Sequence, residues 1–176
     1  MPSISTTSLS LTVQLRSVII WVSGARGGFD GPAGGLYGTL AEELVKEGIC
    51  SLRLNYRFPA DLPSSVTDTL AAISFLEGLG FCSIALVGYS FGGAVVLTAA
   101  PYNALVSSVA TISSQTYGAE NASQVSPRPL FLIHGQMDTR LPASCSERIF
   151  SWAKDPKELI LLPGGDHSLG SCRKEV

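Results

Sequence analysis

Short apolar runs alternate with longer segments of helical periodicity along this chain. Residues 17–22 (SVIIWV) are apolar on both faces and rich in β-branched side chains, which is typical of a strand covered on both sides. Residues 64–79 instead repeat apolar side chains at helical spacing, and the alternation continues to residue 162. The pattern predicts strands at residues 17–22, 49–55, 83–87, 105–112, 129–133 and 158–162, and helices at 36–47, 64–79, 91–100 and 143–153.

The order of these elements predicts the fold class. Strands that alternate with helices of about ten or more residues form a parallel sheet with helices on both faces. We therefore expect one three-layer α/β/α domain over residues 1–176, with a mainly parallel sheet of about six to seven strands, including a short strand at residues 9–15. Ligands bind such sheets at the carboxyl ends of the strands, so functional residues are expected directly after a strand.

One predicted strand ends in a glycine-rich turn around a serine. The sequence LVGYSFGG matches the pattern G-x-S-x-G at Gly88, Ser90 and Gly92, between an apolar strand and a helix. A nucleophile on such a sharp turn adopts strained backbone angles, and its neighbours two places away must lack side chains to allow close approach. The start of the next helix would stabilise negative charge that develops there. An ordinary turn with a serine cap is the alternative, but this context favours a nucleophile.

A histidine and an aspartate follow two other predicted strands. His167 comes directly after the last strand, and histidine is the usual base for activating a serine hydroxyl near neutral pH. Asp138 follows the fifth strand and can reach the same rim, where it would orient the imidazole. Asp166 is the rival acid, but it is adjacent to His167 in sequence and would have difficulty reaching Nδ1 in the ring plane. We expect His134 to pack or hydrogen-bond beside the acid loop.

Three motifs together resemble the α/β-hydrolase superfamily, which places its triad in the order Ser…Asp…His. They are G-Y-S-F-G at residues 88–92, H-G-x-x-D at 134–138 and G-D-H at 165–167, and the similarity extends over about residues 18–167. The subgroup that the chain most resembles is the compact, lidless serine esterases similar to dienelactone hydrolases. Dienelactone hydrolases themselves carry a cysteine nucleophile, where this chain has Ser90. The resemblance implies a minimal α/β-hydrolase fold that uses no cofactor and no metal, with a catalytic triad of Ser90, Asp138 and His167.

The resemblance also implies an oxyanion hole. After the first strand comes the loop SGARGGFDGP, where the superfamily often has His-Gly followed by small residues. Ser23 replaces that histidine and Gly24 matches the glycine. The backbone N–H groups of Phe91 and Ala25 would then hold the oxyanion, with Arg26 as the alternative to Ala25. A phosphate-binding loop is excluded because neither G-x-G-x-x-G nor G-x-x-x-x-G-K-[ST] is present.

The chain between the nucleophile and the acid is too short for a cap domain. We therefore expect an open site, shaped by loops such as residues 55–63 and 115–126. Tyr89 and Arg57 are candidate substrate-binding residues, and Arg57 could meet an anionic substrate group. The simpler alternatives are that Tyr89 packs the turn and that Arg57 is a solvated loop residue.

Composition narrows the classes of partner. Charged residues make up 15% of the chain, the formal net charge is −2, and no cluster of lysine or arginine occurs. This gives no electrostatic reason to expect nucleic acid or an anionic membrane as a partner. The four cysteines are widely spaced with no C-x-x-C, which argues against a zinc or dithiol site. No apolar run reaches the ~18–20 residues of a membrane helix, and the N-terminus does not resemble a signal peptide, so we expect a cytoplasmic protein.

These observations predict a serine hydrolase of the carboxylesterase class (EC 3.1.1) that cleaves a small ester or thioester through an acyl-enzyme on Ser90. The expected partner is a small-molecule ester. One alternative is a serine peptidase or amidase of the same fold, because a triad does not distinguish esters from amides. Another is a non-catalytic binding protein, since a fold does not fix function. The complete set of serine, aspartate and histidine argues against that last alternative.

Overall fold

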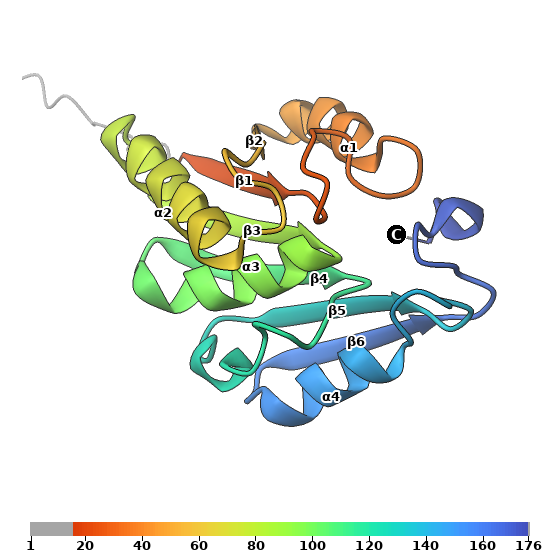
Figure 1. The fold of residues 1–176 in the computed structure, drawn as a ribbon. Coiled ribbons are helices and arrows are strands. Elements are labelled where there is room, and N and C mark those ends of the chain that lie inside the picture. Colours follow the sequence, from red (N-terminus) through yellow and green to blue (C-terminus); the bar gives the residue numbers. More distant parts are fainter. Residues whose placement is uncertain (1–15, 176) are drawn as a thin grey trace, which may run out of the picture.

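A single parallel sheet organises the computed structural model, which describes residues 16–175 (Figure 1). Among these residues the sheet has six strands in the order β2-β1-β3-β4-β5-β6, and every neighbouring pair is parallel. The strands are β1 (Ser17–Val22), β2 (Cys50–Leu54), β3 (Ser83–Tyr89), β4 (Val106–Ile112), β5 (Leu130–Gly135) and β6 (Lys157–Leu162). The α-helices are α1 (Leu36–Leu44), α2 (Leu62–Gly78), α3 (Phe91–Ala99) and α4 (Ser144–Trp152). Short 3-10 helices are η1 (Val45–Glu47), η2 (Ala100–Tyr102), η3 (Ala122–Gln124) and η4 (Gly170–Cys172).

Helices cover both faces of the sheet, which confirms the predicted three-layer α/β/α architecture. On one face α2, α3 and α4 pack over a large apolar cluster that includes Ile73, Leu97 and Ile149. On the other face α1 and η4 cover a smaller cluster that includes Tyr37 and Leu169. Helix α3 is apolar on nearly all sides, and eight of its residues are buried. Such a helix is stable only when it is enclosed, and α3 is enclosed between the central strands and α2.

The predicted element boundaries agree with the structure to within a few residues. The helix expected over 36–47 begins at Leu36, and it ends in η1 with Gly48 at φ 74° as its C-cap. Helix α2 begins two residues before the expected start, because Asp61 caps it by accepting a hydrogen bond from the Ser64 N–H. The sheet is entirely parallel rather than mainly parallel among the described residues. The strand expected at residues 9–15 lies outside the described residues.

In the part of the chain that the structure describes, no helix combines the length and apolar character needed to cross a membrane.

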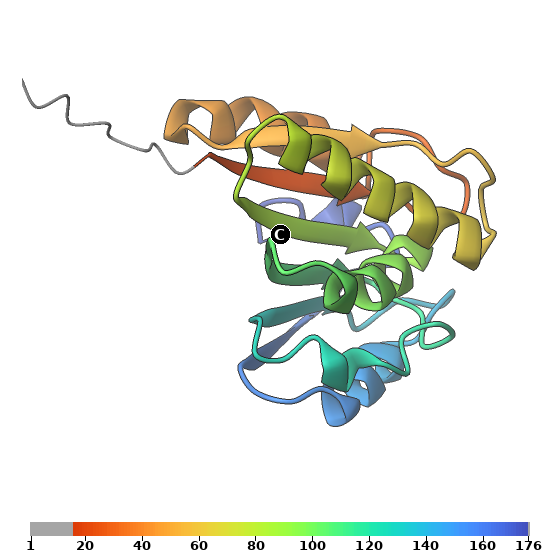
Figure 2. The same cartoon turned by 90° about the vertical axis from the view of Figure 1, so that its left-hand side faces the viewer.

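The parallel sheet brings four loops to one edge. They follow β1, β3, β5 and β6, so the carboxyl ends of these strands all face the same side (Figure 2). The turn after β3 carries Ser90, the loop after β5 carries Asp138, and the loop after β6 carries His167. Residues distant in sequence therefore share one rim of the molecule, where ligands of open α/β sheets bind.

Candidate active site

Ser90 lies on a strained turn between β3 and α3. Its backbone has φ 55° and ψ −117°, a combination that is unfavourable for a residue with a side chain. Three backbone hydrogen bonds hold it there: the Ser90 N–H donates to the Ile112 carbonyl at 2.8 Å, and the Ser90 carbonyl accepts from the Gly93 N–H at 3.0 Å and from the Gln115 N–H at 3.5 Å. Strain of this kind persists only where the surrounding structure imposes it, and it is common at functional sites.

The glycines on either side of Ser90 allow three backbone segments to meet. A Cβ atom on Gly88 would lie 2.2 Å from the Gly92 carbonyl oxygen. A Cβ atom on Gly92 would lie 2.4 Å from the carbonyl oxygens of both Val22 and Ser23. The start of α3 therefore packs directly on the end of β1, and this contact places the loop after β1 beside the serine.

Replacing Gly92 with alanine is expected to lower the free energy of unfolding by about 3 kcal/mol, because backbone cannot yield as a flexible side chain can. Gly78→Ala is the matched control, since a Cβ atom there would meet nothing within 4 Å. Urea unfolding followed by circular dichroism measures both. Equal unfolding midpoints for Gly92→Ala and the wild type would show that the close approach is not tight.

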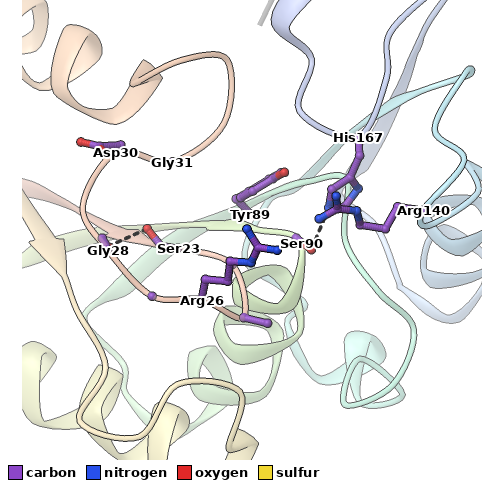
Figure 3. Close-up of a pocket in the computed structure, with 12 residues that line it drawn as sticks. Ser23, Arg26, Gly28, Asp30, Gly31, Tyr89, Ser90, Arg140 and His167 are labelled. Carbon is purple, nitrogen blue, oxygen red and sulfur yellow. Dashed lines mark hydrogen bonds between the residues drawn. The ribbon is translucent and has the colours of Figure 1, made fainter.

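A continuous chain of hydrogen bonds links Ser90 to Asp138 through His167. The His167 Nε2 atom lies 3.1 Å from the Ser90 Oγ atom, a hydrogen bond drawn as a dashed line in Figure 3, and the Nδ1 atom lies 2.7 Å from Asp138 Oδ2. The His167 side chain is 11% exposed and that of Asp138 is fully buried. The imidazole is thus open to the pocket on one side and fixed by a buried carboxylate on the other.

Asp138 is held as a carboxylate by its neighbours. Its Oδ1 atom accepts hydrogen bonds from the backbone N–H groups of Arg140 and Leu141, each at 2.8 Å. Burial raises the pKa of Asp138, but the hydrogen bonds from Leu141, His167 and Arg140 outweigh it, so the net pKa lies below its usual value. Asp138 is therefore ionised at neutral pH, as an orienting acid must be.

Of the two other residues considered for this network, Asp166 lies outside it, whereas the His134 Nε2 atom lies 3.2 Å from Asp138 Oδ2. Asp166 is exposed and accepts a hydrogen bond from the Ser168 hydroxyl, not from His167. His134 is fully buried, with its Nε2 atom 2.8 Å from the Leu141 carbonyl oxygen and its Nδ1 atom 2.7 Å from the Ser146 hydroxyl. It supports the loop that carries the acid and does not reach the pocket.

The loop after β1 turns tightly at the pocket. The Gly27 N–H donates to the Gly24 carbonyl at 2.9 Å, which leaves Ala25 and Arg26 at the centre of the turn. Within residues 16–175 no acceptor is found for the N–H groups of Ala25, Arg26 or Phe91. Phe91 is the first residue of α3, where an N–H has no partner inside the helix. All three expected oxyanion donors are therefore available, and both Ala25 and Arg26 line the pocket.

Two buried tyrosines fix this loop, and the sequence reasoning missed both. The Tyr56 hydroxyl donates to the Ser23 carbonyl at 2.7 Å, and the Tyr37 hydroxyl donates to the Val22 carbonyl at 3.1 Å. Burial raises the pKa of both phenols, so they remain protonated donors. Asn55 adds a third support, because its Oδ1 atom accepts the Gly28 N–H at 2.8 Å. Tyr37 comes from α1, and Asn55 and Tyr56 come from the loop after β2; no local motif marks any of them.

We expect Tyr56→Phe to lower the free energy of unfolding by about 1–3 kcal/mol, since the buried Ser23 carbonyl loses its donor. If the loop shifts, kcat/KM for an ester should also fall, by up to about 10²-fold. Tyr102→Phe is the control, because Tyr102 is 71% exposed. Chemical denaturation and steady-state kinetics separate the two effects. Lower stability with unchanged kcat/KM would limit Tyr56 to a purely structural role.

A cavity of about 370 Å³ opens beside Ser90. Tyr89 is part of its lining, and its ring centroid lies 5.3 Å from that of His167. The expected loops at 55–63 and 115–126 provide none of the lining residues. Most of the lining comes from the loop after β1, and Arg140 and Asp30 are lining residues that the sequence reasoning did not select. The full set is Ser23, Gly24, Ala25, Arg26, Gly27, Gly28, Asp30, Gly31, Tyr89, Ser90, Arg140 and His167.

The structure does not support the expectation that Arg57 binds the substrate. It does not line this cavity but a separate hollow over β2 and α2. Its Nε atom and its backbone N–H both donate to Asp68, whose side chain is 7% exposed. A buried carboxylate on α2 needs a partner, and Arg57 supplies it, so the guanidinium is held away from Ser90.

Comparisons with known proteins bear on the fold. No protein-family model matches the chain. It is 37% identical over 107 residues to the uncharacterized protein YfhR of Escherichia coli (strain K12), a match that covers 48% of this chain and 38% of YfhR. The match thus spans well under half the length of that relative.

Solved structures are similar over nearly the whole chain. Dienelactone hydrolase from Anabaena variabilis has a TM-score of 0.77 at 16% identity, covering 93% of this chain and 84% of that one. The esterase domain of a Rhodothermus marinus protein has a TM-score of 0.73 at 21% identity, with 90% and 80% covered. Est1E from Butyrivibrio proteoclasticus, with ferulic acid bound, has a TM-score of 0.76 at 16% identity, with 90% and 84% covered. The chain has the α/β-hydrolase fold.

Proposed function

We propose that this protein is a serine hydrolase that cleaves a small carboxylic ester or thioester through an acyl-enzyme on Ser90. The observation that carries this proposal is the hydrogen-bonded chain from Ser90 Oγ through His167 to the buried carboxylate of Asp138, at distances of 3.1 and 2.7 Å. Nucleophile, base and orienting acid are thus within hydrogen-bond reach in the free protein. The strained turn directs the serine into a cavity rather than into the protein.

The proposed reaction begins when Ser90 Oγ attacks the ester carbonyl carbon and its proton moves to His167 Nε2. The negative oxygen of the tetrahedral intermediate accepts hydrogen bonds from the N–H of Phe91 and that of Ala25 or Arg26. When the bond to the leaving group breaks, that alcohol or thiol takes the proton from Nε2. Water then repeats the sequence: it gives a proton to Nε2 and its oxygen attacks the acyl carbon. When the bond between the acyl carbon and Ser90 Oγ breaks, Oγ takes the proton back from Nε2 and the carboxylic acid departs.

Asp138 keeps the imidazole in the state this cycle needs. Its carboxylate accepts the Nδ1–H of His167 at 2.7 Å. Nε2 is then the free lone pair that faces Ser90, and the carboxylate stabilises the imidazolium ion after proton transfer.

The size of the cavity and the solved structures similar to this chain favour a small ester over a peptide as the substrate. The cavity of about 370 Å³ is lined mainly by the loop after β1. Two of the similar structures are described as an esterase domain and a dienelactone hydrolase. An ester of a short acyl chain fits this space.

A fluorophosphonate probe tests the proposal, because it phosphonylates only an activated serine. Intact-mass analysis should show one adduct per chain, and peptide mapping should place it on Ser90. A panel of 4-nitrophenyl esters, the matching thioesters and aminoacyl 4-nitroanilides then separates esterase from amidase. The proposal fails if the folded protein takes up no probe, and the substrate class is wrong if the anilides are cleaved faster than the esters.

A further inference from the structure

Two arginines border the nucleophile without a charged partner. Arg26 lies in the turn after β1 and Arg140 in the loop after β5, and both line the cavity that contains Ser90. Both are exposed. Among residues 16–175, no ion pair or hydrogen bond is recorded for either guanidinium. Each is therefore free to bind a group that enters the cavity.

The two guanidinium groups approach the same place from opposite sides. In Figure 3 the Arg26 side chain extends from the loop after β1 toward Ser90, the Arg140 side chain extends from the loop after β5 toward His167, and both residues line the same cavity. Burial raises the pKa of Tyr89; the charge of Arg140 opposes that rise, and those of Asp138 and Asp166 add to it, so Arg140 lies near the Tyr89 phenol. Arginines from two different loops thus converge where a bound ester must lie.

No acidic residue among residues 16–175 forms an ion pair with Arg26 or Arg140. Asp30 also lines the cavity, but in Figure 3 its carboxylate points away from Ser90. Asp166 accepts its hydrogen bonds from Ser168. The Asp138 carboxylate is fully buried and hydrogen-bonded to His134, to His167 and to the N–H groups of Arg140 and Leu141. In the described part of the chain, neither arginine is therefore bonded to a carboxylate near the cavity.

We propose that Arg26 and Arg140 select esters that carry a second, anionic group, the simplest case being the monoester of a dicarboxylic acid. This inference rests on the proposed serine-hydrolase function and adds the substrate class. A guanidinium offers paired N–H donors whose spacing matches a carboxylate, and such charge-assisted hydrogen bonds are stronger than neutral ones. The free carboxylate would lie between the two arginines while the ester carbonyl lies on Ser90.

The test compares two esters of equal shape and different charge. The 4-nitrophenyl monoester of adipic acid ends in a carboxylate, and 4-nitrophenyl 6-methylheptanoate ends in an uncharged isopropyl group of the same form. We expect the ratio of their kcat/KM values to favour the anionic ester by about 10-fold or more. Raising the salt concentration should reduce that ratio, because screening weakens attraction between exposed charges. Monoesters of glutaric and pimelic acid test the reach of the arginines.

Substitutions locate the selectivity. Arg26→Gln and Arg140→Gln should each lower the anionic-to-neutral ratio by about 5–10-fold, and the double variant should bring it close to one. Arg148→Gln is the charge-matched control on the exposed side of α4, and it should keep the wild-type ratio. Urea unfolding of each variant checks that the fold is intact.

The possible outcomes distinguish failure of this inference from failure of the proposed serine-hydrolase function. If Ser90 takes up the fluorophosphonate and both esters are hydrolysed with equal kcat/KM, the hydrolase proposal stands and the role of the arginines is wrong. A preference that survives in the double arginine variant would also overturn that role. If the folded protein takes up no probe and hydrolyses neither ester, the serine-hydrolase proposal itself fails.

Discussion

Replacing Ser90 with alanine is expected to reduce kcat for a 4-nitrophenyl ester by about 10⁶-fold, as removing the nucleophile of a serine triad does. The proposed pathway needs a covalent bond between the acyl carbon and Ser90 Oγ, so no acyl-enzyme can form without that atom. Fluorophosphonate labelling should disappear at the same time. What remains should be slow hydrolysis assisted by the oxyanion donors alone. Stopped assays at high enzyme concentration, corrected for the uncatalysed rate, measure that remainder.

Ser151→Ala is the matched control for this experiment. Ser151 is an exposed serine on α4 whose hydroxyl donates to the Arg148 carbonyl of the same helix. Its loss should leave kcat and labelling within about twofold of the wild type, as expected for a surface substitution. Ser90→Ala keeps a side chain of similar size at φ 55°, so its stability should stay close to that of the wild type. A Ser90→Ala protein with undiminished esterase activity would remove Ser90 from the mechanism.

The fold could be predicted because each strand and each helix has its own recognisable pattern of apolar residues. Residues 17–22 are apolar on both faces, and that alone indicates a strand between two layers of helices; β1 occupies this range as a central strand. Ser90 could be selected for a similar reason, since its glycines and the strand before it are local in sequence. Asp138 and His167 needed one further rule, that residues after parallel strands share one edge. In the structure they lie within hydrogen-bond distance of each other.

Other features of the site depend on contacts that no local pattern encodes. Arg57 and Arg140 both follow strands at the same edge, and the sequence does not distinguish them. The structure distinguishes them. The buried Asp68 binds Arg57 away from the cavity, whereas Arg140 lines the cavity. Likewise Tyr56 supports the loop after β1 through a hydrogen bond that spans 33 positions. Which side chain meets which distant partner is decided by packing, and periodicity describes only which face a residue occupies.

The second large effect is expected for Asp138→Asn, which should lower kcat by about 10⁴-fold while the fold is retained. The asparagine carbonyl can still accept the N–H groups of Arg140 and Leu141, which hold the Oδ1 atom at 2.8 Å each. Its NH₂ group then takes the place of Oδ2 and faces His167 Nδ1. A donor at that point forces Nδ1 to be the acceptor, so the remaining proton moves to Nε2. Nε2 then carries a hydrogen toward Ser90 Oγ and can no longer remove the serine proton.

Asp166→Asn is the control that tests whether the loss of kcat is specific to Asp138. Asp166 is the other carboxylate next to His167, but it is exposed and binds Ser168, so the Asp166→Asn variant should keep kcat within about twofold of the wild type.

The pH dependence of stability gives a second readout. Because the folded-state pKa of Asp138 lies below its usual value, its contribution to stability is complete above about pH 4 and is lost as the pH falls further. Asp138→Asn should lack that acid-dependent loss, whereas Asp166→Asn should keep it. Equal losses of kcat in the two variants would mean that Asp138 does not orient the base.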